Sequence, residues 1–208
     1  MANSMQHWNG NQLCAVDTET TGLDYLYHEI VQICILPLDS NIEPRKDILP
    51  FYIDMRPWYP ERADEAALKK NKLKLADLML KGFDKDASID LMEEWLEKLD
   101  LPYTASGRRK QIVPLGQNYA FDLRFILAWI GRKTYDEYFH YHFKDTMIAA
   151  GYLNDRAAMH GEKVPYPKVN LQYLCSTLKI KTDRAHDALQ DCVATAKVYK
   201  EMLKVGLF

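Results

Sequence analysis

Residues 13–23 read LCAVDTETTGL. Four strand-forming residues lead into two acids, Asp17 and Glu19, and then into a hydroxyl-rich turn that a glycine closes. Because side chains alternate between the two faces of a strand, the two carboxylates point the same way. Two carboxylates so close together raise each other's pKa unless a cation lies between them. The pair therefore favours a hard divalent metal ion with oxygen ligands, the alternative being a strand-ending acid followed by a solvated turn residue.

The chain has the length and composition of an ordinary globular protein. Its 208 residues are 48% hydrophobic and 27% charged, so we expect residues 1–208 to form a single domain with a sizeable core. No apolar stretch is long enough to cross a bilayer and the first residues lack a secretion signal, which predicts a cytoplasmic protein without a membrane partner. Four scattered cysteines are expected to be reduced core residues. A formal net charge of −2 leaves only local basic runs, at 69–74, 108–110 and 179–184, to attract a polyanion.

The order of the predicted elements describes a mixed sheet covered by helices. Apolar runs between turn residues predict strands over 12–17, 29–38, 48–55 and 111–115. Helical spacing predicts helices over 61–80 with breaks, 88–99, 121–130, 145–152, 170–178 and 185–203, with Ser88 as an N-cap and Gly131 as the end of its helix. Three meandering strands followed by strand–helix alternation indicate one α/β domain. The cation-rich loop 101–110 and the aromatic-rich stretch 135–143 match no motif.

Two further acids stand where helices begin. Asp122 shares the inward apolar stripe of its helix with Phe125 and Trp129, and a carboxylate on a buried face needs a partner or a metal ion. Asp191 repeats this pattern, and His186 precedes it by five residues. Taken singly, each of these acids is equally typical of a helix cap, and the histidine is equally typical of a surface residue. Together with the first pair of acids they fit two Mg²⁺ or Mn²⁺ ions and a proton acceptor, which indicates phosphodiester hydrolysis.

Three short motifs carry a family resemblance. Residues 17–22, DTETTG, resemble the first motif of the DEDDh, or DnaQ-like, 3′→5′ exonucleases. Residues 118–122, NYAFD, are similar to the second motif, and residues 186–191, HDALQD, to the third. The motifs occur in the family's order, and the resemblance covers residues 12 to about 203. Gln117 departs from the pattern, because the family has a histidine there, but that histidine is not a metal ligand and activity is expected to survive.

The resemblance implies an RNase H-like fold, in which helices flank both faces of a central mixed five-stranded sheet. It implies that Asp17, Glu19 and Asp191 hold one Mg²⁺, and that Asp17 and Asp122 hold a second, with Mn²⁺ able to substitute. His186 is then the general base that activates the attacking water. The terminal nucleotide of the substrate is expected to lie against Thr18, Thr20, Gly22, Leu23 (as an apolar wedge), Asn118 and Phe121.

These implications predict a metal-dependent 3′→5′ exonuclease that acts mainly on single-stranded DNA and releases 5′-mononucleotides. An RNA-trimming enzyme of the ribonuclease T or oligoribonuclease kind is an alternative, because contacts to the 2′-hydroxyl cannot be read from the sequence. The proofreading subunit of a DNA polymerase is a second alternative. A catalytically silent nucleic-acid-binding module is a third, and the five intact chemical positions argue against it. The expected partners are 3′ ends of single-stranded DNA or RNA, with a polymerase and a homodimer left open.

Overall fold

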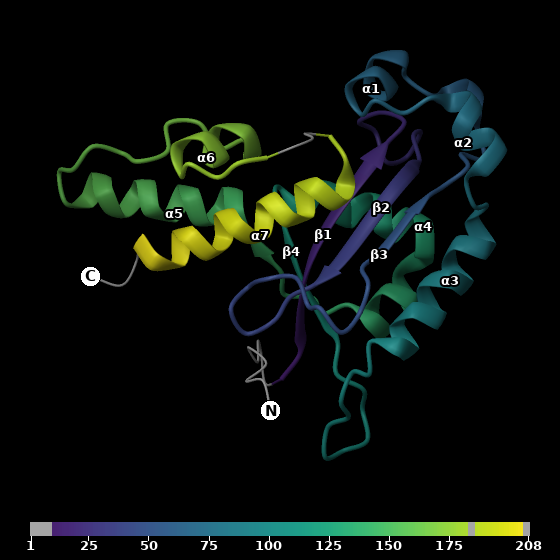
Figure 1. Ribbon diagram of the computed structural model, residues 1–208, viewed down its shortest axis with the longest axis horizontal. Coiled ribbons are helices and arrows are strands. Elements are labelled where there is room, and N and C mark those ends of the chain that lie inside the picture. The colour runs from purple at the N-terminus through teal and green to yellow at the C-terminus, as the bar shows by residue number, and fades with distance from the viewer. Residues whose placement is uncertain (1–9, 183–185, 206–208) are drawn as a thin grey trace.

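A mixed five-stranded sheet forms the centre of the fold (Figure 1). The computed structural model describes residues 10–182 and 186–205. Its strands are β1 (Gln12–Thr20), β2 (Ile30–Pro37), β3 (Phe51–Asp54), β4 (Ile112–Gly116) and β5 (Lys144–Asp145). They lie in the order β3-β2-β1-β4-β5, with antiparallel pairs on the β3 side of β1 and parallel pairs on the β5 side. The predicted mixed sheet is confirmed.

Helices cover both faces of this sheet (Figure 1). The helices are α1 (Glu65–Lys70), α2 (Leu75–Lys81), α3 (Lys85–Lys98), α4 (Tyr119–Tyr138), α5 (Thr146–Met159), α6 (Leu171–Thr177) and α7 (Ala188–Val205), with a short 3-10 turn at Pro60–Arg62. One face packs against α7, and the other packs against α3 and α4. α5 and α6 pack on α7 and extend that side of the molecule.

The central strand β1 is buried on both sides, and its residues divide between two cores. Leu13 and Ala15 belong to the core beneath α7. Cys14 and Val16 belong to the larger core beneath α3 and α4. A strand covered on both faces reads as a continuous apolar run, which is why the opening LCAV stretch shows no polar alternation. The same alternation carries the side chains beyond Val16 to opposite faces of the sheet.

Two of three local predictions are wrong, each for a physical reason. The strand predicted to end at Asp17 continues to Thr20, because β1 keeps pairing with β2 up to that point. Gly131 ends the first helical segment of α4 as predicted, since its φ of 76° and ψ of 159° are not helical, and a second segment continues across this kink as far as Tyr138. Ser88 lies inside α3, because Asp84 caps that helix by accepting a hydrogen bond from the backbone N of Ala87 at 2.9 Å.

All four cysteines, Cys14, Cys34, Cys175 and Cys192, are buried free thiols, as predicted. Among the described residues, no helix combines the length and the apolar surface that a bilayer span demands. The single domain and the cytoplasmic location stay predictions.

One buried carboxylate that sequence reasoning did not single out fixes the starts of two helices. Asp145 accepts hydrogen bonds from the backbone N atoms of Asn118 (3.2 Å) and Tyr119 (2.7 Å), where α4 begins. It also accepts from the backbone N atoms of Met147 (2.7 Å) and Ile148 (3.3 Å), in the first turn of α5. Because the first N–H groups of a helix have no partner within the helix, one side chain satisfies both ends. Asp145 thereby sets the position of α4 relative to β5.

Replacing Asp145 with Ala is expected to lower the free energy of unfolding by about 3 kcal/mol, because four backbone donors, two of them at each helix start, lose a charged acceptor. Urea denaturation followed by circular dichroism measures this. Asp155→Ala, at an exposed position of α5, is the matched control and is expected to change the stability by less than about 0.5 kcal/mol. Equal stabilities for the two variants would contradict the double-cap role.

Candidate active site

The last residues of β1 lie at an opening in the sheet. Parallel pairing between β1 and β4 stops at Ala15 and Leu115, whereas pairing with β2 continues to Thr20. β4 ends at Gly116, and the chain then turns into α4. The neighbour of the last residues of β1 on that side is therefore the start of a helix and not a strand. The start of α7 approaches the same end of β1 from the other face (Figure 1). In sheets of this kind, ligands bind at the carboxyl ends of strands where the strand connections diverge.

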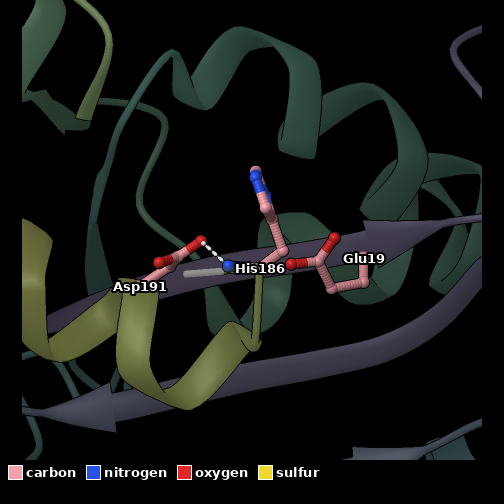
Figure 2. Close-up of side chains that lie close together, drawn as sticks. All are labelled: Glu19, His186 and Asp191. Atoms are coloured by element: carbon pink, nitrogen blue, oxygen red, sulfur yellow. Dashed lines mark hydrogen bonds between the residues drawn. The ribbon is translucent and has the colours of Figure 1, made fainter. Parts of the chain in front are cut away.

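Three candidate ligands meet closely at this opening. Ligand atoms of Glu19, His186 and Asp191 all lie within 4.8 Å of one another. The backbone N of His186 donates a hydrogen bond to Oδ2 of Asp191 at 3.2 Å, which ties the lead-in of α7 to its first turn. Figure 2 shows the two carboxylates on either side of the His186 backbone, with the imidazole ring extending away from it. Glu19 is buried, and the other two residues are half-buried.

The fourth carboxylate, Asp122, reaches the same strand from α4. Its Oδ1 accepts hydrogen bonds from the backbone N of Thr18 at 2.9 Å and from the hydroxyl of Thr18 at 2.7 Å. The acid is buried, and these bonds lower the cost of its burial. Neither Asp122 nor Asp17 is part of the close group of three, within the residues described. Asp17 is linked to both parts electrostatically, because the charges of Asp122, Glu19 and Asp191 all raise its pKa.

Burial and neighbouring acids raise the pKa of every acid at this opening. Burial is the largest cause at each one, and it raises the pKa of Glu19 to about 8, of Asp122 to about 7 and of Asp191 to about 6. The pKa of Asp17 is raised well above its ordinary value, first by burial and then by Asp122, Glu19 and Asp191. Four acids in one place are all ionised at neutral pH only if cations compensate them. A set made of carboxylate oxygens fits hard divalent ions such as Mg²⁺ or Mn²⁺.

His186 is held in an unusual backbone conformation. Its φ is 63°, in the left-handed region that few residues other than glycine adopt. Its Nε2 lies 3.2 Å from Nε2 of Gln172, a residue of α6. Burial lowers the pKa of the imidazole, and the charges of Lys70 and Lys72 lower it further. A neutral imidazole with a lowered pKa can accept a proton near neutral pH. The expected helix start at 185 lies outside the described residues, and α7 begins at Ala188.

The expected substrate-contacting residues fall into two groups. Thr18 and Thr20 are buried and form structural hydrogen bonds, the hydroxyl of Thr20 donating to the carbonyl of Gly22 at 2.6 Å. Leu23 is 81% exposed at the tip of the turn between β1 and β2, so an apolar surface faces outward there. The other two residues lie at the start of α4. Asn118 has a left-handed backbone conformation and precedes the helix. Phe121 is half-buried and packs on Phe125, with the two ring centres 4.9 Å apart.

Two polar side chains explain how the neighbouring loops are held. Gln117, which departs from the family pattern, donates from Nε2 to the carbonyl of Val169 at 2.7 Å and accepts from the hydroxyl of Thr146 at 2.6 Å. It therefore ties the turn before α4 to α5 and to the segment before α6. Asn71 donates from Nδ2 to the carbonyl of Thr20 at 3.1 Å, which fixes the end of α1 against β1. Neither contact has a local signal in the sequence.

Comparison with solved structures shows the same fold in known nucleases. No protein-family model matches the chain, and no curated protein sequence does. The chain is similar to cell-death related nuclease 4 (CRN-4), with a TM-score of 0.70 and 16% identity over 94% of this chain and 64% of that one. It is similar to the zinc-bound complex of E. coli exonuclease I with single-stranded DNA (TM-score 0.68, 17% identity, 95% of this chain and 41% of that one). It is also similar to exonuclease I from Methylocaldum szegediense (0.67, 17%, 94% and 41%).

These likenesses establish the architecture. The chain spans less than two thirds of the length of each of these nucleases. The RNase H-like α/β fold that the motifs implied, with helices on both faces of a mixed five-stranded sheet, is confirmed.

The raised acid pKa values make the metal-free protein less stable as the pH rises. A carboxyl whose pKa is higher in the folded than in the unfolded chain binds more protons when folded, so the free energy of unfolding falls between about pH 4 and about pH 8, the value for Glu19. We expect Tm in EDTA to fall by at least about 3 °C from pH 5 to pH 8, and Asp17→Asn to reduce that fall.

The matched control is Asp90→Asn, an exposed acid of α3, which is expected to leave the pH dependence unchanged. Differential scanning calorimetry across the pH range measures all three proteins. A Tm that stays constant or rises between pH 5 and pH 8 in EDTA would show that the pKa values of these acids are not raised in the folded protein.

Proposed function

We propose that this chain is a metal-dependent 3′→5′ exonuclease that hydrolyses single-stranded DNA to 5′-mononucleotides. One observation carries the proposal: acids from β1, α4 and α7 converge on one opening of the sheet, beside a histidine. Their burial is unfavourable for an uncomplexed protein, since every one of them has a raised pKa. A set of groups that destabilises the fold indicates a functional site. The shared fold with exonucleases supports the same activity.

The four carboxylates would hold two Mg²⁺ ions, with Mn²⁺ able to substitute. Asp17, Glu19 and Asp191 would hold one ion, and Asp17 with Asp122 the other. When bound, such ions polarise the phosphodiester and lower the pKa of a coordinated water. The protein contributes the rigidity of the site: Oδ1 of Asp122 is fixed on Thr18, and Asp191 is fixed on the backbone N of His186. Ligands held this way keep their positions without substrate.

His186 would accept the proton of the attacking water. Its pKa is lowered by burial and by two lysines, which favours the neutral ring, the form that accepts a proton. Gln172 contacts Nε2 and restrains the ring's orientation. The left-handed backbone places the imidazole apart from the helix that follows it (Figure 2). These features suit a general base whose position has to be maintained through the reaction.

The surface around the acids suits a single-stranded end. Leu23 presents an exposed apolar side chain next to the site, and apolar or aromatic contacts to bases do not depend on base identity. Thr18 and Thr20 lie at the end of β1, Gly22 follows them in the turn, and Asn118 and Phe121 lie at the start of α4. The single-stranded DNA held by E. coli exonuclease I is in keeping with this substrate class.

The reaction is tested with oligonucleotides labelled at the 3′ or the 5′ end, as DNA and as RNA of the same sequence, in Mg²⁺ or in EDTA. We expect the 3′ label to be released first as a mononucleotide, only in the presence of the metal ion, and faster from DNA. Faster digestion of RNA would identify the exoribonuclease alternative instead. Cleavage in EDTA, or digestion from the 5′ end, would refute the proposal.

Asp191→Asn is expected to reduce kcat by more than about 100-fold, because a ligand loses its charge while its shape is kept. Glu201→Gln, farther along the same helix, is the matched control and should retain wild-type activity. Steady-state kinetics measures both, and circular dichroism checks that the variants are folded. Wild-type turnover by Asp191→Asn would remove this residue from the metal site.

His186→Ala is expected to reduce kcat about 100- to 10,000-fold and to leave Mg²⁺ binding intact, since general-base catalysis contributes on that scale. His160→Ala, at the exposed end of α5, serves as the control. Isothermal titration with Mg²⁺ separates the loss of a base from the loss of a metal ligand. A weakened ion affinity would assign His186 to the metal instead.

A further inference from the structure

The two segments that matched no motif lie together at the far end of the sheet. Residues of the loop 101–110 and of the stretch 135–143 line a cleft of about 400 Å³. The cleft lies beside Gln111, at the strand ends where β1 and β4 begin. Gln12 and Glu19, at opposite ends of β1, are roughly 23 Å apart at about 3.3 Å per residue. The cleft is therefore a separate site from the carboxylates, and we call it the basic cleft, after its residues Arg108, Arg109, Lys110, His140, Tyr141 and His142.

The cations of the basic cleft sit on a closed hairpin. The backbone N of Thr104 donates to the carbonyl of Arg108 at 2.7 Å, and the backbone N of Lys110 donates to the carbonyl of Pro102 at 2.7 Å. Gly107 takes up a φ of 77° at the tip, and its N donates to the carbonyl of Thr104 at 2.9 Å. These bonds fix the loop, so its charged side chains project from a defined backbone instead of a flexible one.

Three consecutive rings form the opposite wall. The rings of His140 and Tyr141 are stacked, with centres 4.6 Å apart and planes at 21°, and those of Tyr141 and His142 are 4.1 Å apart. The backbone N of His142 donates to Nδ1 of His140 at 3.0 Å, and the backbone N of His140 donates to the carbonyl of Ile112 at 2.7 Å. Tyr141 is 71% exposed, so a face of this platform is open for a further ring.

The electrostatics of the basic cleft suit an anion. Arg109 is anchored by Glu97, Nη1 to Oε1 at 2.7 Å, and by the carbonyl of Leu96 at 2.6 Å. Its Nε, among the described residues, is a buried donor that has no hydrogen-bond partner. Arg108 is exposed, and its charge acts on His140. The cleft therefore combines one exposed cation, Arg108, with the half-buried cations Arg109 and Lys110, and this set attracts an anion.

We propose that the basic cleft binds single-stranded nucleic acid, with phosphates on Arg108 and Lys110 and a base stacked on Tyr141. This inference rests on the proposed function, because the cleft would hold the part of a substrate that lies away from the reacting end. Cations next to an exposed ring match the alternation of phosphates and bases in a single strand. A small anion has no base and would make no use of the ring. At about 3.4 Å per stacked nucleotide, a strand needs roughly seven nucleotides to reach from the carboxylates to the cleft.

The test compares oligothymidylates of about four and about twenty nucleotides. Tyr141→Ala is expected to weaken binding of the longer strand about tenfold, because base–aromatic stacking contributes on that scale. Its kcat/KM should fall by the same factor for the longer strand and stay unchanged for the shorter one, which cannot span the distance. Tyr141→Phe keeps the ring and should keep the affinity. Tyr152→Ala, an equally exposed tyrosine of α5, is the matched control.

The charge contribution is tested separately. The double variant Arg108→Gln with Lys110→Gln should lower the slope of log affinity against log salt by about 1.4, since each phosphate contact to a single strand contributes about 0.7. Arg109 is left in place, because it anchors the hairpin to α3. An unchanged slope, or equal losses by the short and the long strand, would overturn the proposal.

Binding is measured by fluorescence anisotropy in EDTA, which separates this inference from the proposed function. Without metal ions the four acids repel a polyanion, so the affinity then reports on the rest of the surface. If the wild-type protein hydrolyses nothing in Mg²⁺, but Tyr141→Ala weakens binding of the longer strand, the exonuclease proposal is refuted and the cleft proposal is supported. If the Tyr141→Ala variant hydrolyses both strands at the wild-type rate and binds them equally well in EDTA, the cleft proposal is refuted and the exonuclease proposal stands.

Discussion

The withdrawal of four neighbouring carboxylates from solvent is the constraint around which this end of the molecule is arranged. Each acid at the opening of the sheet has a raised pKa, and burial is the leading cause at every one. The fold offsets part of this cost with fixed donors: the backbone and hydroxyl of Thr18 for Asp122, and the backbone of His186 for Asp191. Lys70, at the end of α1, lowers the pKa of Glu19 and of Asp191 from a distance. The compensation that remains missing is what a divalent cation would provide.

Much of the fold could be predicted from local patterns, and the exceptions show where such patterns stop. The run LCAV, buried on both faces, identified the central strand, and the spacing of apolar residues located most helices. Gly131 correctly indicated the end of a helical segment, but the local pattern did not reveal that a second segment follows it across the kink. Ser88 was misleading because Asp84, four residues earlier, is an equally good cap and leaves the serine buried inside α3. The two-residue strand β5 is too short to carry any pattern.

The candidate site divides in the same way. Its acids and histidine could be found because each one breaks an apolar pattern at the start or end of an element, and the structure places Glu19, His186 and Asp191 together. The groups that support them could not be found from the sequence, because their contacts join residues that are far apart in the chain. Asn71 reaches Thr20, and Gln172 reaches His186, through bonds that leave no trace in local sequence. Asp145 is similar: an acid before a helix predicts one cap, and only the fold brings a second helix start within its reach.

The bond between Thr18 and Asp122 has a consequence for the sheet as well as for the site. Beyond Ala15, β1 has lost its parallel neighbour β4, and the N–H of Thr18 on that side is taken up by a side-chain oxygen of α4. A carboxylate thus continues the hydrogen-bonded ladder for one more step after the strand that built it has ended. The backbone of β1 therefore fixes the position of the Asp122 carboxylate. Its second oxygen, Oδ2, is positioned by the same hydrogen bond.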